Sequence, residues 1–199
     1  GVYTPNGVGN TNLVYSYTDP LTSCTNTDTL VAIVVAPPVV SAGNDVSVCE
    51  DTSDVVMVGG PVGGLWSGNG INGSSGIYTV SNVGNYTFTY TYGTGTCLVT
   101  DQVILTVNAL PVVGAGNDVS YCVDAGLQTM VGSPSGGIWT GLGITNGSSG
   151  IFDPDVAGAG IHTLVYSYVD GNSCENSDTV LITVNGLPYV DAGLDTNIC

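Results

Sequence analysis

The chain has 199 residues, of which none is Lys or Arg and 16 are Asp or Glu, so its formal net charge at pH 7 is −16. Because phosphate recognition depends on Lys and Arg, this composition argues against nucleic-acid binding and predicts repulsion from anionic membrane surfaces. Hydrophobic residues make up 43% of the chain, which is not the composition of a disordered protein. Abundant Gly, Thr, Val, Ser and Asn favour short strands joined by tight turns.

A stretch that runs from one cysteine to another occurs three times, at 24–49, 97–122 and 174–199, and the copies align without a gap. Each copy has an aspartate, an apolar run of strand type, a proline, an Ala-Gly pair and a second aspartate. The pattern predicts the last strand of one domain, a stiff junction, and the first strand of the next. The chain is therefore interpreted as part of a tandem array.

Matching segments that begin at Gly1, Gly76 and Gly150 give a repeat period of about 75 residues. The expected domains are the C-terminal half of a repeat at 1–36, complete repeats at 37–109 and 110–186, and the first strand of a further repeat at 187–199. Because both ends fall in mid-repeat, we expect a window on a longer protein. A repeat of this size has a marginal core, so covalent links or packing between neighbours should add stability.

Within each complete repeat, a short apolar strand is expected at 54–58 and at 127–131. A third strand carries the motif Gly-Gly-x-Trp-x-Gly, and a tryptophan at this place is the usual core anchor of an immunoglobulin-like sandwich. Apolar residues alternate with Thr at 86–92, which places one face of that strand in a core. The expected core residues are Trp66, Trp139, Tyr90 and Tyr166. The predicted fold class is all-β, with tandem immunoglobulin-like sandwiches of about seven short strands.

Six cysteines recur at two matched positions per repeat, which predicts disulfides and an oxidising compartment. They are Cys24, Cys49, Cys97, Cys122, Cys174 and Cys199. An interdomain pair, Cys49–Cys174, joins the far pole of one sandwich to the near pole of the next and requires the least distortion of the chain. The second alternative pairs cysteines within a domain, Cys49–Cys97 and Cys122–Cys174. Sequential pairing, such as Cys24–Cys49, would have to bring together the ends of two extended strands.

No catalytic site is expected, because the single histidine, His162, occupies an ordinary strand position and no Ser-His-Asp set can be built around it. No metal site or cofactor is expected either, with Ca²⁺ as an open alternative. The weak calcium candidates are the junction aspartates Asp45, Asp118, Asp191 and Asp195. They lack the dense spacing of a strong calcium loop, so turn capping and solubility are their expected roles.

Taken together, these motifs resemble the Ig-like and PKD-like tandem repeats of giant Bacteroidetes cell-surface proteins. The motifs that carry the resemblance lie at 38–45, 48–49, 63–68, 166–170 and 174–179. The resemblance implies type IX secretion and a role in adhesion, gliding motility or extracellular filaments, similar to gliding adhesins such as SprB. The chain departs from the pattern at Gly93, where the next repeat has Asp170.

Two Asp-Thr-aliphatic triplets resemble the O-glycosylation signal of Bacteroidetes, which makes Thr29 and Thr179 candidate modification sites. Sugar at these threonines would mask the sheet edges and hinder proteases.

We expect a non-enzymatic, extracellular protein of the cell surface, whose repeats form a stiff, disulfide-stapled stalk or fibre for adhesion or gliding motility. One alternative is a subunit of a self-assembling filament or sheath. Another is a carbohydrate-binding accessory module. The expected partners are copies of the chain itself, or a surface or polysaccharide ligand. Direct membrane insertion is not expected, because no apolar run approaches 18 residues.

Overall fold

The structure is a computed structural model that describes residues 2–193 and 195. Strands dominate the described residues, which otherwise contain the 3-10 turn η1 (Gly95–Cys97) and the short helix α1 (Pro154–Ala157). The expected all-β class with immunoglobulin-like sandwiches is confirmed. The chain falls into two compact units, one built from the segments up to residue 44, 56–78 and 87–103, and the other from 45–55, 79–86 and 104 onward.

The N-terminal hairpin pairs β1 (Gly9–Thr18) with β2 (Thr25–Val34) in antiparallel register along their whole length. Alternating apolar and polar residues favour this pairing, and they place Leu13 opposite Leu30 on one face. The turn between the strands is held by Asp19, whose carboxylate accepts the N–H groups of the second and third following residues. Those two donors, that of Leu21 first, lower the pKa of Asp19 because they favour its charged form.

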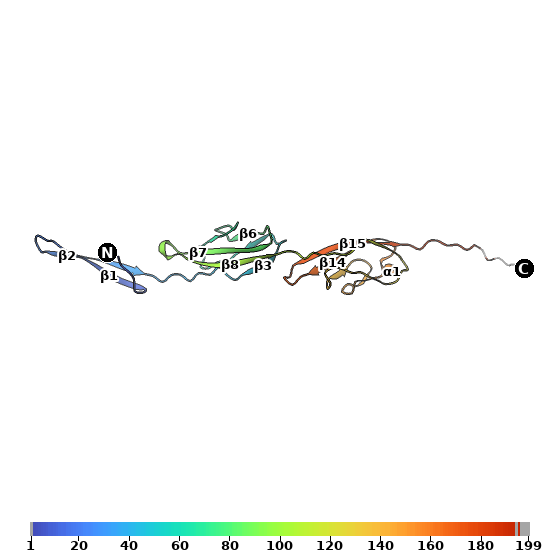
Figure 1. Ribbon diagram of the computed structural model, residues 1–199, viewed down its shortest axis with the longest axis horizontal. Coiled ribbons are helices and arrows are strands. Elements are labelled where there is room, and N and C mark those ends of the chain that lie inside the picture. The colour runs from blue at the N-terminus through green and yellow to red at the C-terminus, as the bar shows by residue number, and fades with distance from the viewer. Residues whose placement is uncertain (1, 194, 196–199) are drawn as a thin grey trace. The chain divides into compact units, whose positions relative to one another are not determined.

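The predicted repeat 37–109 contains a four-stranded sheet of order β3-β8-β7-β5 and a two-stranded sheet, β4-β6. Figure 1 labels β3, β6, β7 and β8 of this repeat. The bounds are β3 (Val46–Cys49), β4 (Asp54–Val56), β5 (Leu65–Ser67), β6 (Ile77–Thr79), β7 (Gly84–Tyr92) and β8 (Val99–Asn108). The rings of Trp66 and Tyr90 pack with centroids 4.9 Å apart, and those of Tyr78 and Phe88 with centroids 5.0 Å apart. The second contact joins the two sheets, since Tyr78 lies on β6 and Phe88 on β7.

The predicted repeat 110–186 contains sheets of order β11-β14-β15-β9 and β10-β13-β12. Figure 1 labels the long hairpin strands β14 and β15 of this repeat. The bounds are β9 (Val119–Cys122), β10 (Gln128–Thr129), β11 (Ile138–Thr140), β12 (Ile144–Asn146), β13 (Ile151–Phe152), β14 (Gly160–Val169) and β15 (Glu175–Asn185). Its buried core consists of Ala115, Met130, Trp139, Phe152, Ala157, Leu164, Tyr166, Val180, Ile182 and Val184. Alternate residues of β14 and β15 supply half of this core, as the period-two pattern predicts.

In both repeats the first strand runs parallel to the last strand of the same repeat. β3 pairs with β8, with Cys49 opposite Asn108, and β9 pairs with β15, with Cys122 opposite Asn185. In the described part of the chain, each of these pairings lies inside one predicted repeat. The strands β4 and β10 are shorter than those expected at 54–58 and 127–131.

Candidate functional site

At the junction motif Pro-x-Val-x-Ala-Gly-x-Asp, the first segment of each complete repeat bends. The residues before the bend and those after it pair with different segments of the repeat. Before the bend, Ser41 forms an antiparallel bridge with Gly60, and after it β3 pairs with β8. The bend contains Gly43 with φ +85°, and the next repeat has Gly116 with φ +84°. Glycine adopts this left-handed conformation without steric strain from a Cβ atom. The single first strand expected from the sequence is therefore divided at the Ala-Gly pair.

The first aspartate of the repeated stretch fastens this bend to the last strand. Asp101 accepts a hydrogen bond from the N–H of Ala42 at 2.8 Å, and Asp178 accepts one from Ala115, also at 2.8 Å. The N–H of Ala115, followed by that of Thr179, lowers the pKa of Asp178, because both donors favour the charged carboxylate. The sequence analysis treated these aspartates as markers of the repeat and did not assign this contact.

The second aspartate binds the same last strand on the other side of the bend. Asp45 accepts from the N–H of Ile104 at 2.8 Å, and Asp118 accepts from that of Leu181 at 2.9 Å. Each repeat thus uses two carboxylates to hold its first segment against its last strand. One carboxylate belongs to the last strand and the other to the first segment. Hydrogen bonds of backbone N–H groups to charged carboxylates are among the stronger hydrogen bonds in proteins.

Two of the weak calcium candidates, Asp45 and Asp118, thus each accept a hydrogen bond from a backbone N–H of the last strand. Asp191 accepts from the N–H of Gly193 at 2.8 Å, and Asp195 lies outside any strand. Among the residues that the structure describes, no group of three or more His, Cys, Asp or Glu is placed to hold a metal ion.

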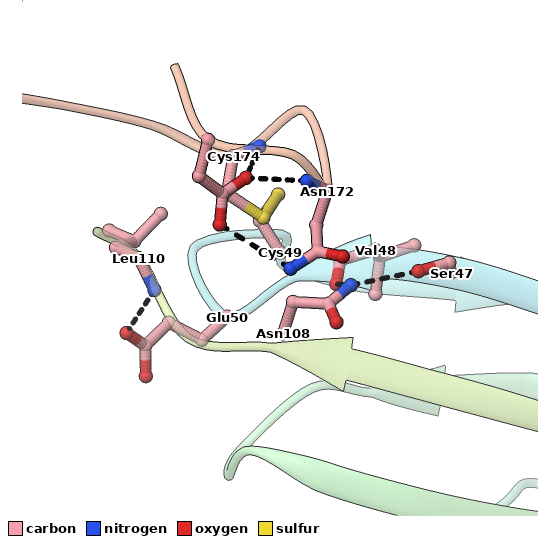
Figure 2. Close-up of a disulfide and its surroundings, with 9 residues drawn as sticks. Ser47, Val48, Cys49, Glu50, Asn108, Leu110, Asn172 and Cys174 are labelled. Carbon is pink, nitrogen blue, oxygen red and sulfur yellow. Dashed lines mark hydrogen bonds between the residues drawn. A yellow bond between two sulfur atoms is a disulfide. The ribbon is translucent and has the colours of Figure 1, made fainter. Parts of the chain in front are cut away.

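A disulfide joins Cys49, the last residue of β3, to Cys174, in the turn between β14 and β15 (Figure 2). Their Cα atoms are 5.6 Å apart, and the two residues are separated by 125 positions in the sequence. This is the interdomain pair that the sequence analysis placed first. The alternatives that use Cys49 or Cys174 with another cysteine do not occur in the structure.

Hydrogen bonds hold both ends of this disulfide (Figure 2). On the β3 side, Asn108 donates from Nδ2 to the Val48 carbonyl at 3.1 Å, and the Glu50 carboxylate accepts the N–H of Leu110 at 2.9 Å. On the other side, Asp170 Oδ1 accepts from the N–H of Cys174 at 2.9 Å. The Glu50 contact ties the cysteine-bearing turn to the segment that leads into the next repeat.

The other described cysteines, Cys24, Cys97 and Cys122, are unpaired and exposed, while Cys199 lies outside the described residues. The backbone at Cys122 matches that at Cys49: the following N–H donates to an Asn carbonyl at 2.9 Å in both places. The turn at Cys24 is one residue longer than that at Cys174, but each begins with an aspartate whose N–H donates to the cysteine carbonyl at 2.9 Å. Cys97 differs, because it ends the turn η1.

A buried tyrosine explains why the motif Gly-Gly-x-Trp contains paired glycines. The hydroxyl of Tyr166 accepts the N–H of Gly137 at 2.8 Å and donates to the carbonyl of Pro134 at 2.5 Å. Tyr90 makes the equivalent bonds in the preceding repeat. A Cβ atom at Gly137 would lie 2.5 Å from Cζ of Tyr166, so this position requires glycine. The four expected core residues, Trp66, Trp139, Tyr90 and Tyr166, are all buried.

The remaining candidates lie in ordinary surroundings. Thr29 and Thr179 are exposed residues on β2 and β15, and O-glycosylation stays a prediction. His162 is half-buried on β14, and its Nε2 lies 2.8 Å from the carbonyl oxygen of Gly158. Tyr86, at the matching position, donates to a carbonyl four residues earlier, at 2.8 Å. His162 therefore has a local structural contact of the same kind.

A hollow of about 850 Å³ opens in the unit that contains β5 and η1, lined in part by Leu65, Trp66, Tyr92 and Leu98. Trp66 is 6% exposed, so its ring is engaged in the core and offers little face to a sugar. Within the described residues, no helix has the length and apolar character needed to cross a membrane.

The two-sheet repeats, the parallel first and last strands and the disulfide define the class of this chain: an all-β protein of immunoglobulin-like sandwiches. No protein-family model matches it, and no curated protein matches it. Among solved structures, it is similar to an I-band fragment of titin, at 14% identity and TM-score 0.39, over 77% of this chain and 67% of that one.

It is also similar to mouse protocadherin-24 EC1-3, at 10% identity and TM-score 0.31, over 90% of this chain and 80% of that one. A third similar structure is a SusE-like surface-located polysaccharide binding protein from the Bacteroides thetaiotaomicron heparin utilisation locus. Its identity is 11% and its TM-score 0.36, over 88% of this chain and 43% of that one. With TM-scores below 0.5, these likenesses carry no argument about family or function.

Proposed function

We propose that this chain is a structural and adhesive repeat region of a long secreted protein of the cell surface. In this proposal, its sandwiches form a stiff stalk or fibre whose neighbouring repeats are stapled by disulfides. The observation that carries the proposal is the disulfide Cys49–Cys174, which links two predicted repeats across 125 positions of sequence. Disulfides persist in oxidising environments, which supports an extracellular location.

The position of the disulfide supports a mechanical role. Tension applied from the N-terminal side reaches Cys49, crosses to Cys174, and continues into β15. The residues between the two cysteines are therefore bypassed by the covalent path and cannot be pulled out while the bond is intact. The segment between the two cysteines, which the disulfide protects from extension, corresponds to about 410–450 Å of extended length at about 3.3–3.6 Å per residue.

The chemistry of the surface supports endurance outside the cell. The chain has no Lys or Arg, so proteases of trypsin specificity find no cleavage site in it. Adhesion or gliding motility, with a surface or polysaccharide as the ligand, is the purpose that the resemblance to Bacteroidetes surface repeats implies. Under this proposal the role is non-enzymatic, and the unpaired cysteines of matching position staple further repeats of the same kind.

Single-molecule force spectroscopy tests the proposal. The chain is stretched from its ends, oxidised and then with reductant, and compared with the double variant Cys49→Ser/Cys174→Ser. Oxidised chains should yield about 410–450 Å less contour length than reduced chains or the double variant. The matched control, Cys97→Ser, should behave as the unaltered chain. Equal contour lengths for oxidised and reduced chains would contradict the staple.

A further inference from the structure

Each cysteine of the disulfide is held in place by residues of its own repeat. On the β3 side, Asn108 donates from Nδ2 to the Val48 carbonyl at 3.1 Å and to the hydroxyl of Ser47 at 2.8 Å (Figure 2). The carbonyl of Asn108 accepts the N–H of Glu50 at 2.9 Å. Asn108 thus bonds to the residues on both sides of Cys49, and all of these contacts lie within one predicted repeat.

Asp170 holds Cys174 within the following repeat. Its Oδ1 accepts the N–H of Cys174 at 2.9 Å and that of Asn172 at 2.8 Å, and its own N–H donates to the Cys174 carbonyl at 2.9 Å. Ser173 lies between the two donors and has φ +66°, a left-handed conformation that is uncommon for a residue with a side chain. The carboxylate therefore stabilises an unfavourable turn and, through it, the position of Cys174.

The hairpin turns of the unpaired cysteines lack this contact. The N–H of Cys24 donates to the hydroxyl of Thr22 at 3.4 Å, and the N–H of Cys97 donates to the carbonyl of Thr94 at 3.0 Å. In the latter turn the position of the aspartate is taken by Gly93, where a Cβ atom would collide with the Cys97 carbonyl oxygen. Of the cysteine-bearing hairpin turns in the described residues, only the stapled one places a carboxylate on the cysteine N–H.

We propose that Asn108 and Asp170 are positioning residues that set the effective concentration of the Cys49 and Cys174 thiols, so that the disulfide closes between repeats that have already folded. The proposal rests on the staple of the proposed function and adds how it forms. All four residues belong to the same compact unit. Because each cysteine is held from inside its own repeat, both are in position before the bond exists. Such preorganisation raises the effective concentration, since less ordering remains when the bond forms.

Exposure determines the order of the exchange steps. Cys174 is 0% exposed, whereas Cys49 is half-buried at the end of β3. Oxidised glutathione, as the oxidant, therefore reacts first with the Cys49 thiolate, which attacks one of its sulfurs and releases reduced glutathione. The Cys174 thiolate then attacks the Cys49 sulfur of this mixed disulfide and releases the second reduced glutathione. One Sγ–Sγ bond forms, the two thiol protons leave with the two glutathione thiols, and the glutathione disulfide takes up two electrons.

Equilibration with glutathione measures the effective concentration, which is the equilibrium constant of this exchange. The background variant carries Ser at every cysteine except Cys49 and Cys174. In it, Asp170→Ala should lower the effective concentration about ten- to a hundred-fold, because a hydrogen bond to a charged group is lost. Asp170→Asn keeps an acceptor oxygen and should restore most of it. Asn108→Ala removes neutral hydrogen bonds and should lower it about two- to ten-fold.

Each substitution has a matched control in the same chain. Asn185 donates from Nδ2 to the Tyr121 carbonyl at 3.3 Å, which is the equivalent contact beside position 122, so Asn185→Ala should leave the effective concentration unchanged. Asp19→Ala removes the aspartate of the β1–β2 turn and should also have no effect. Urea unfolding of the reduced variants identifies conditions in which each is fully folded. A change measured there does not come from a loss of overall stability.

The rate of the closing step separates positioning from a general structural role. Rapid mixing with excess oxidised glutathione forms the mixed disulfide at Cys49, and mass spectrometry of acid-quenched samples follows its conversion to the internal disulfide. Asp170→Ala should slow this conversion in the folded chain, and urea that unfolds the repeats should abolish it.

The outcomes distinguish this proposal from the staple itself. Equal effective concentrations and closing rates for Asp170→Ala and Asp19→Ala would overturn the positioning role and leave the staple intact. A background variant that forms no internal disulfide would instead contradict the staple. If Asp170→Ala does not fold, Asn108→Ala compared with Asn185→Ala decides in the same way, since equal values for these two would overturn the positioning role.

Discussion

The hairpins β1–β2 and β14–β15 have matching sequences and equivalent registers but very different environments. Leu13 lies opposite Leu30 in the first, and Leu164 lies opposite Val180 in the second. Leu164 is 0% exposed, because the strands of its own repeat cover it, whereas Leu30 is 67% exposed. Alternation within the two strands is therefore sufficient to pair them, but it does not bury them. Burial comes from segments that lie tens of residues earlier in each repeat.

The largest expected effect on stability comes from shortening a leucine that occurs at the matching position of both hairpins. Leu164→Ala should reduce the free energy of unfolding of its repeat by about 2–5 kcal/mol, because it leaves a cavity in a closed core. Leu13→Ala, at the matching half-buried position, should cost much less. Amide hydrogen exchange of β1–β2 and of β14–β15 measures the two losses separately. Similar losses for the two variants would mean that the N-terminal hairpin has a covered core in solution.

The cysteines of the two turns provide the second contrast. Cys174 is 0% exposed and paired, whereas Cys24 is exposed and unpaired. Cys174→Ser should lower the stability of the oxidised chain by about 2–4 kcal/mol, because the disulfide no longer restricts the unfolded state. Cys24→Ser should stay within about 0.5 kcal/mol of the parent chain. Denaturation of both variants without reductant checks this difference, and reductant should remove it.

Much of the fold could be predicted from the sequence because its signals are local. The period-two alternation at 86–92 gave a strand, and the tryptophan motif gave the buried Trp66 and Trp139. The pair Cys49–Cys174 was the first of three pairings that the sequence left open, and a topological argument about which poles of neighbouring sandwiches meet placed it first. That argument needed only strand order and direction, which immunoglobulin-like sandwiches share.

The contacts that hold the junction could not be predicted in the same way, because they join residues about sixty positions apart. The bond from Ala115 to Asp178 spans 63 positions. The sequence did contain a signal for these contacts, since the aspartate and the Ala-Gly pair occur in every copy of the repeated stretch. The paired glycines before each tryptophan were a second signal. They reflect the close approach of Tyr90 and Tyr166, which no local pattern reveals.

A smaller effect is expected at the buried tyrosine. Tyr166→Phe removes the hydroxyl that bonds Gly137 and Pro134, and the loss should be about 1–3 kcal/mol, because buried backbone groups are left without these partners. Tyr15→Phe removes an exposed hydroxyl from the matching position and should be nearly neutral. Thermal and urea unfolding distinguish the two substitutions. Equal effects would show that the hydroxyl of Tyr166 contributes nothing beyond its ring.

The smallest expected effect is a pH dependence at Asp178. The pKa of this carboxyl is lowered in the folded chain, first by the N–H of Ala115 and then by that of Thr179. Its contribution to stability is therefore complete above the unfolded-state value of about 4, and it is lost as the pH falls through the folded-state pKa. Asp178→Asn should be less stable at pH 7 and should lose less stability between pH 5 and 2, as measured by urea unfolding at each pH. Asp124→Asn removes the same charge from an exposed site and serves as the control. If the acid limb of the Asp178→Asn curve were as steep as that of the unaltered chain, the Ala115 contact would not be the source of the pH dependence.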